Sequence, residues 1–136
     1  MTLVPATDGS TRSPVAGFKV SLAYPASVSL PGSGLLSVDD PSDPATREVL
    51  LDLNLYNGLI VFNDTDTALI TTLAPSSPVS LAAPYPFERA RFDCSAGTQV
   101  APGAFSCSVV DESDRLGSTI PPDQRPACQV TLTPAP

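Results

Sequence analysis

Short stretches in which apolar and polar residues alternate recur along this chain, and a period of two is typical of a β-strand with one buried face. The clearest is residues 15–24, VAGFKVSLAY, where every second residue from Phe18 to Tyr24 is large and apolar. No window places apolar residues at helical spacing over three turns, so the pattern predicts an all-β protein. Further strands are expected at residues 47–56, 59–62, 67–73, 87–94, 105–110 and 128–132.

The stretch 87–110, FERARFDCSAGTQVAPGAFSCSVV, is the most informative part of the chain. It predicts two strands joined by a loop that contains Gly and Pro, with Cys94 and Cys107 each in the apolar phase of its strand. The same phasing along the whole chain predicts a set of core side chains, namely Phe18, Val20, Leu22, Leu51, Leu53, Phe92, Val109 and Val130.

Length and composition indicate the number of domains and the class of fold. With 136 residues the chain suits one domain with a real core, and its hydrophobic fraction of 42% argues against disorder. Eight or nine short strands separated by polar loops predict a two-sheet β-sandwich, because two sheets can share one core. We expect the domain to span residues 15–133. Residues 1–14 are then either a linker or hold a short edge strand at Thr2–Val4, and residues 134–136 form a tail.

The charge balance limits the classes of partner. Seven basic and 14 acidic residues give a formal net charge of −7, which disfavours nucleic acid or an anionic membrane as partners. No apolar run approaches the roughly 20 residues of a membrane helix, so membrane insertion is not expected. The first residues also lack the basic and apolar regions of a signal peptide.

Residues that carry out chemistry are scarce. The chain contains no His, which removes the Ser-His-Asp and Cys-His arrangements and the commonest zinc ligand, so we expect a protein that is not an enzyme. No cofactor is expected apart from calcium, which takes oxygen ligands from flexible acidic loops. The best calcium candidates are Asp111, Glu112 and Asp114, three acids within four residues, with the loop 63–66 as the alternative.

Three cysteines in strand positions point to an oxidising compartment and to one structural disulfide. If the strands that carry Cys94 and Cys107 run antiparallel, both cysteines lie at the same end of the domain, so this pairing is favoured. Cys107–Cys128 is the next choice, because the long loop 111–127 allows the chain to return. The remaining thiol is expected to be buried and inert.

Three segments resemble cohesin-type domains. In VAGFKVSLAYPASVSL the family pattern is matched by Ala16, Gly17, Phe18, Leu22, Tyr24, Pro25 and Ala26, although the Asp usual before that Pro is absent. FERARFDCSAG matches at Ala90, Phe92 and Gly97, and SVVDESDRLGSTI resembles the end of the pattern. The resemblance covers residues 15–132. The same segments also resemble carbohydrate-binding modules, which belong to the same superfamily. This resemblance implies a nine-stranded jelly roll.

The resemblance also implies a function. We expect a non-catalytic adhesion or scaffold module, extracellular or on the cell surface within a larger secreted protein, whose partner is another protein module. The alternative is a carbohydrate-binding module that recognises a polysaccharide, which would need exposed aromatic rings. Tyr24 and Phe62 lie in phases that predict burial, and Tyr85 is the ring expected to be partly exposed.

Overall fold

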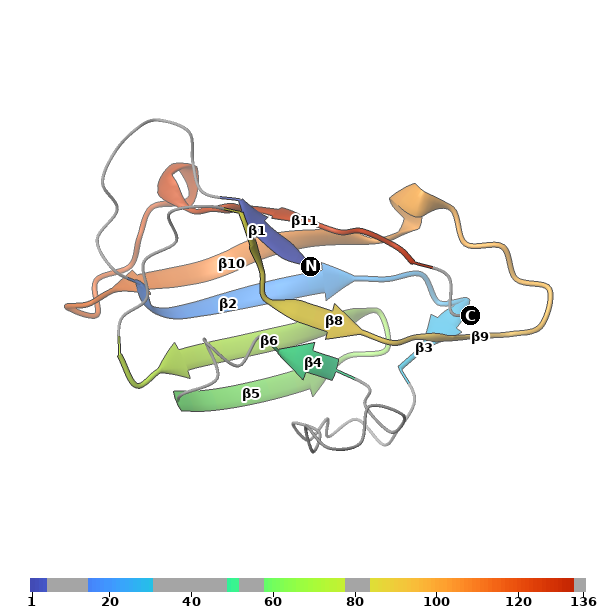
Figure 1. Ribbon diagram of the computed structural model, residues 1–136, viewed down its shortest axis with the longest axis horizontal. Coiled ribbons are helices and arrows are strands. Elements are labelled where there is room, and N and C mark those ends of the chain that lie inside the picture. Colours follow the sequence, from blue (N-terminus) through green and yellow to red (C-terminus); the bar gives the residue numbers. More distant parts are fainter. Residues whose placement is uncertain (5–14, 31–48, 52–57, 78–83, 134–136) are drawn as a thin grey trace.

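The computed structural model describes residues 1–4, 15–30, 49–51, 58–77 and 84–133, and these residues confirm an all-β protein. Its largest unit is a four-stranded antiparallel sheet with the order β10-β2-β6-β5 (Figure 1). The four strands are β2 (Val15–Ala23), β5 (Gly58–Asp64), β6 (Ala68–Pro75) and β10 (Ser106–Asp114).

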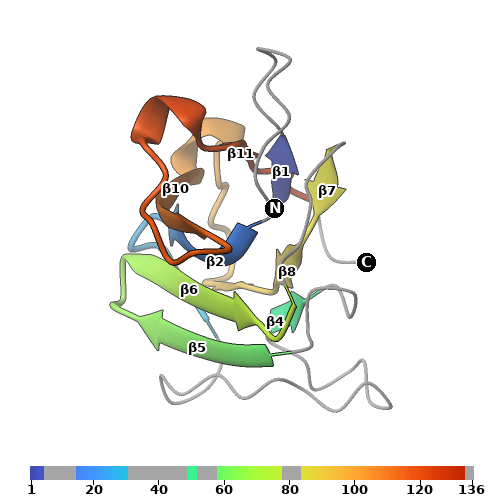
Figure 2. The ribbon, with the colours of Figure 1, turned by 90° about the vertical axis from the view of Figure 1, so that its left-hand side faces the viewer.

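The remaining strands form three smaller antiparallel sheets. β1 (Thr2–Val4) lies between β11 (Ala127–Gln129) and β7 (Tyr85–Pro86). β3 (Val28–Ser29) pairs with β9 (Asp93–Cys94), and β4 (Val49–Leu51) pairs with β8 (Glu88–Ala90). Two 3-10 turns, η1 (Pro102–Ala104) and η2 (Pro122–Gln124), complete the described elements. Figure 2 shows β1, β7, β8 and β4 on one side of the four-stranded sheet.

The register of the large sheet decides which side chains face the core. Phe18 on β2 lies opposite Leu73 on β6 and opposite Glu112 on β10, so these three side chains share the inner face. Between Val109 and Asp111 the register of β10 shifts by one residue. Such a bulge reverses the alternation, because two residues on one strand then face a single residue on its partner. Glu112 is consequently directed inward, where strict alternation from Val109 would have placed Asp111.

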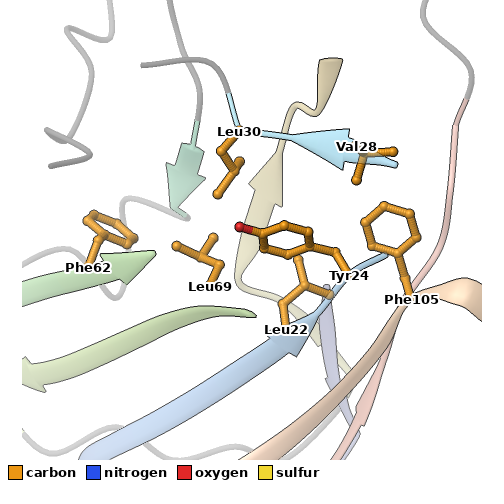
Figure 3. Close-up of a cluster of buried hydrophobic side chains, with 7 residues drawn as sticks. All are labelled: Leu22, Tyr24, Val28, Leu30, Phe62, Leu69 and Phe105. Carbon is orange, nitrogen blue, oxygen red and sulfur yellow. The ribbon is translucent and has the colours of Figure 1, made fainter. Parts of the chain in front are cut away.

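The core consists of two clusters on this inner face. One joins β2, β5 and β6 to the β3 region and to Phe105 (Figure 3), and it comprises Leu22, Tyr24, Val28, Leu30, Phe62, Leu69 and Phe105. The other contains Val15, Phe18, Val20, Leu73 and Phe87. Side chains from the smaller sheets thus cover the large sheet, which removes apolar area from water on both sides of the contact.

All six expected core residues whose side chains the structure describes lie in or against these clusters. Phe18, Val20 and Leu22 are buried, whereas the other three pack against the clusters while half-buried: Phe92, Val109 and Val130. The side chain of Leu51 and the whole of Leu53 lie outside the described residues. The expected strand at Thr2–Val4 is present, but as the middle strand of its sheet and not at an edge.

Candidate functional site

The outward face of the four-stranded sheet has an apolar half on β5 and β6. On β5, Leu59 and Val61 are 66% and 48% exposed, and they alternate with Ile60 and Phe62, which pack against the core. On the same face of β6, Ala74 lies opposite Leu59, Thr72 lies opposite Val61, and Ile70 follows. We call the four outward residues Leu59, Val61, Ile70 and Ala74 the apolar strip.

The other half of this face is mostly polar, although Val110 at the bulge of β10 is 48% exposed. Lys19 and Ser21 on β2 and Ser108 and Asp111 on β10 continue the cross-strand rows that begin on β5. Asp111 also forms an ion pair with Arg125, with 3.6 Å between the Arg125 Nη2 and Asp111 Oδ1 atoms. The face therefore changes from apolar at the β5 edge to hydrophilic at the β10 edge.

The two edges of the sheet differ in how they are protected against pairing with another chain. β10 carries the bulge and an inward-directed acid, Glu112, and its Cys107 is tied by a disulfide to β11, which lies against it. These features hinder pairing with a further strand. β5, with the sequence GLIVFND, contains no Lys, Arg or Pro, and within the described residues it pairs with β6 alone. As far as the described residues go, the β5 edge is thus the less protected one.

Both ends of β5 are held firmly. At its start, a Cβ atom added to Gly58 would lie 2.1 Å from the Ala74 carbonyl oxygen, so only glycine permits this close approach to β6. At its end, the Tyr24 hydroxyl donates a hydrogen bond to the Asp64 carboxylate. Asp64 Oδ1 also accepts the Asp66 N–H at 3.0 Å. Burial, and then the bond to Asp64, raise the pKa of the Tyr24 hydroxyl, which stays protonated and keeps donating.

Two carboxyl groups are buried inside the domain. Glu88 on β8 is 5% exposed and Glu112 on β10 is 1% exposed. Burial raises the pKa of Glu88 from 4.5 to about 7, since a low-dielectric environment disfavours the charged form. The Thr71 hydroxyl and the Met1 amine lower this pKa by smaller amounts. Neither the Thr71 hydroxyl nor the Glu88 carboxyl has a partner at full hydrogen-bond geometry. The Met1 amine donates to the Glu88 main-chain carbonyl.

The phasing of residues 88–92 contains a signal for the inward position of Glu88. Extending the inward phase of Phe92 and Ala90 back by two residues reaches Glu88, but a carboxylate is normally expected on the solvent side. The apolar strip was also detectable, because residues 59–62, LIVF, are apolar in both phases. Because the two phases lie on opposite faces of a strand, only one of them can face the core, and the apolar residues of the other phase must point away from it.

The expected calcium ligands do not converge. Glu112 is buried, Asp111 is exposed beside Arg125, and Asp114 binds main-chain N–H groups of its own loop. Asp111 and Glu112 are consecutive strand residues and therefore lie on opposite faces of β10, and the bulge decides that Glu112 is the inward one. In the part of the chain that the structure describes, no group of three or more acidic or cysteine side chains could hold a metal ion. Calcium binding stays a prediction, without support from these side-chain positions.

Asp114 has a structural role that leads to a prediction. Its Oδ1 atom accepts the N–H groups of Leu116 at 2.8 Å and Ser118 at 2.9 Å, and Gly117 adopts a positive φ of 80°. Asp114→Ala is expected to lower the free energy of unfolding by about 1–2 kcal/mol, because two donors lose their acceptor. Asp114→Asn keeps an equivalent oxygen and is expected to remain close to wild type. Denaturant titration of both variants measures this, and equal losses would contradict the assigned role.

The expected disulfide Cys94–Cys107 is wrong. Cys107 is bonded to Cys128, with 5.5 Å between their Cα atoms, and Cys94 is free and exposed. The reason is that β9 pairs with β3, which places Cys94 opposite Val28 and away from β10. β11 meanwhile lies against β10 and brings Cys128 to Cys107. An open pocket of about 260 Å³ lies beside Cys94, lined by Ala26, Ser27, Val28, Ser29, Asp93 and Ser95.

The aromatic rings whose side chains are described lie in the interior. Five are buried and Phe92 is half-buried, and the centroid of the Phe92 ring lies 4.9 Å from that of Tyr24, in a tilted contact, and 5.1 Å from that of Phe105, in an edge-on contact. The predicted burial of Tyr24 and Phe62 is confirmed, whereas the side chain of Tyr85 is outside the description. Across the described ranges, no helix is long and apolar enough to cross a membrane.

The chain matches no protein-family model, no curated protein and no solved structure.

Proposed function

We propose that this protein is a non-catalytic adhesion or scaffold module that binds another protein through the apolar strip and the edge of β5. The observation that carries the proposal is the exposure of Leu59 and Val61 on the less protected edge strand of the sheet. Single exposed apolar residues are common, but neighbouring ones on a sheet edge are a feature of interaction sites. Covering such a strip contributes about 25 cal/mol per Å² of apolar area removed from water.

A cohesin-like sandwich is part of the same proposal. Small sheets that pack on one face of the four-stranded sheet support a two-sheet β-sandwich. The nine-stranded jelly roll and the cohesin-like interpretation rest on the resemblance in residues 15–132. The disulfide Cys107–Cys128 supports an extracellular or cell-surface location, because such bonds persist in oxidising compartments.

The alternative is a carbohydrate-binding module. Sugar recognition commonly uses aromatic rings that are open to solvent, whereas the described rings here are occupied in the core. The arrangement of apolar aliphatic residues on β5 and β6 favours a protein surface as the partner. A glycan array separates the two functions, since saturable and specific sugar binding would support the alternative.

The test of protein binding is a selection that starts without a known partner. A phage-displayed library of random peptides is panned against the domain, and the enriched peptides are measured against two variants. Leu59→Lys/Val61→Lys places charges on the apolar strip, as natural edge strands do to block pairing. The control Leu116→Lys/Leu132→Lys adds the same charge at two other exposed leucines. Thermal unfolding of both variants establishes that they are folded.

We expect enriched peptides to lose at least about tenfold in affinity on the β5 variant and to bind the control like wild type, because a loss of about 1.4 kcal/mol corresponds to tenfold. Peptides that bind all three proteins equally would exclude the strip as the binding surface. Saturable glycan binding in the absence of strip-dependent peptides would replace the proposal by the carbohydrate alternative.

A further inference from the structure

β5 has the properties of a strand that accepts another strand. It is seven residues long and lies at the end of the sheet order, and its sequence is rich in β-branched and aromatic residues. In an antiparallel sheet, alternate residues direct their N–H and C=O groups to opposite sides of the strand. The groups of β5 that face away from β6 have no strand partner within the described ranges, and a strand added at this edge would pair with them.

We propose that the partner supplies an extended segment that adds to β5 as a fifth strand of the sheet, with apolar residues in one phase and a Lys or Arg beside Asp66. This inference rests on the proposed function, since it specifies how the protein partner binds there. Main-chain hydrogen bonds provide the general affinity in this mode of recognition, and alternate side chains provide the specificity.

The side-chain pattern of the added segment follows from the two faces of the sheet. Residues in one phase lie on the outward face beside Leu59 and Val61, which are exposed and apolar. Cross-strand neighbours on one face are about 4.5–5.5 Å apart, so apolar residues in that phase extend the apolar strip by direct contact. The other phase lies on the inward face beside Ile60 and Phe62, at the margin of the core.

Charge determines the end of the segment and the identity of the occupant. Asp66 lies shortly after β5 and is exposed. The Asp64 carboxylate, in contrast, already accepts hydrogen bonds from the Tyr24 hydroxyl and the Asp66 N–H. A basic side chain near this turn therefore meets a negative charge. The net charge of −7 on each chain opposes a second copy as the occupant, and it favours a basic partner.

The contrast between the two edges identifies β5 as the accepting edge. The β10 edge has a bulge and the buried Glu112, and it is linked to β11 through Cys107–Cys128. Both edges belong to one sheet, and among the described residues these protective features occur at the β10 edge alone. A strand added at β5 continues the ladder without displacing any described contact.

The experiment uses the intact chain and the peptides selected on it, synthesised with single N-methyl groups at each position in turn. N-methylation removes one main-chain donor and adds bulk at the strand interface. If the peptide adds as a strand, N-methyl groups at alternate positions weaken binding by at least about tenfold each, and those between them by less than about twofold. A control peptide with the same residues in scrambled order should not bind.

Asp66→Asn tests the basic contact without changing the turn, since Asn tolerates the φ of 64° at this position. Peptides with Lys or Arg near that end are expected to bind this variant about two- to fivefold more weakly at low salt. If these peptides bind Asp66→Asn as tightly as wild type, the proposed contact between Asp66 and a basic residue of the partner is wrong.

The outcomes separate this inference from the proposed function. Strip-dependent peptides whose affinity shows no alternation on N-methylation would overturn strand addition and leave protein binding in place. An absence of strip-dependent peptides would overturn both. Sedimentation of the domain alone is expected to show a monomer, and a dimer abolished by Leu59→Lys/Val61→Lys would assign the edge to a second copy.

Discussion

Glu88→Gln is expected to make the domain more stable by about 3 kcal/mol at about pH 8, while leaving its stability at about pH 4 nearly unchanged. The reason is that the buried carboxyl of Glu88 has a pKa of about 7 in the folded protein, compared with 4.5 when it is free in water. Wild-type protein must either hold a proton on Glu88 or bury its charge, whereas Gln is neutral at every pH.

The direction of this effect follows from proton binding. Because the pKa is raised on folding, the folded state holds the Glu88 proton more tightly than the unfolded state does. Below about pH 4 both states are protonated, so folding carries no penalty from this group. Between pH 4.5 and about 7 the unfolded state ionises first, and the stability of wild type falls as the pH rises. Above that window the loss is constant.

Denaturant titrations of wild type and variant across this pH range measure the difference directly. The Met1 amine beside Glu88 also titrates, and the Glu88 charge raises the pKa of this amine, so the measured difference includes the coupling between the two groups. Asp93→Asn, which neutralises an exposed acid on β9, serves as the control and should follow wild type. Parallel pH profiles for wild type and Glu88→Gln would show that Glu88 is solvated and would contradict its burial.

Removal of the disulfide is the second large effect that we expect. Cys107→Ala/Cys128→Ala should lower the free energy of unfolding by about 3 kcal/mol. The bond joins residues 21 positions apart. In the chain-entropy model, closing this loop lowers the conformational entropy of the unfolded chain, and removal of the bond restores that entropy and so stabilises the unfolded state. A loss of this size is a large fraction of the roughly 5–15 kcal/mol by which domains are stable.

Cys94→Ser is the matched control, because it removes the free, exposed thiol and should leave the stability within about 0.5 kcal/mol of wild type. In the native protein, Cys94 is expected to be alkylated by iodoacetamide, and non-reducing peptide mapping should recover Cys107 linked to Cys128. A peptide that links Cys94 to Cys107 would restore the pairing that strand direction alone had favoured. Equal stability of the double variant and wild type would contradict the structural role of the bond.

The local pattern was sufficient for the strands with one apolar phase. Phe18, Val20 and Leu22 are buried because a period of two leaves no other face for them once Lys19 and Ser21 remain in water. The same pattern predicted an all-β protein, since it depends only on residues close in sequence. The expected cohesin-like topology required long-range information, and it remains a proposal based on resemblance.

Residues 87–94 show where local reasoning failed. A single strand was expected there, with Ala90, Phe92 and Cys94 inward, but β8 ends at Ala90 and β9 begins at Asp93. The two short strands pair with different partners, β4 and β3, so Cys94 leaves the inward phase and becomes exposed. Strand pairing between distant segments has no signature within either segment.

What the sequence determined by itself is the class of structure and the inward phase of a strand with one apolar face, such as β2, because these follow from the periodicity of neighbouring residues. Only the tertiary structure decided the disulfide Cys107–Cys128, the burial of Glu88 and Glu112, and the exposure of Leu59 and Val61 on β5. The disulfide depends on β11 lying against β10, the buried Glu112 on a bulge, and the exposure of the two β5 residues on which face of the large sheet is covered. Each is a relation between segments far apart in the chain, and such relations are set by the packing of the whole domain.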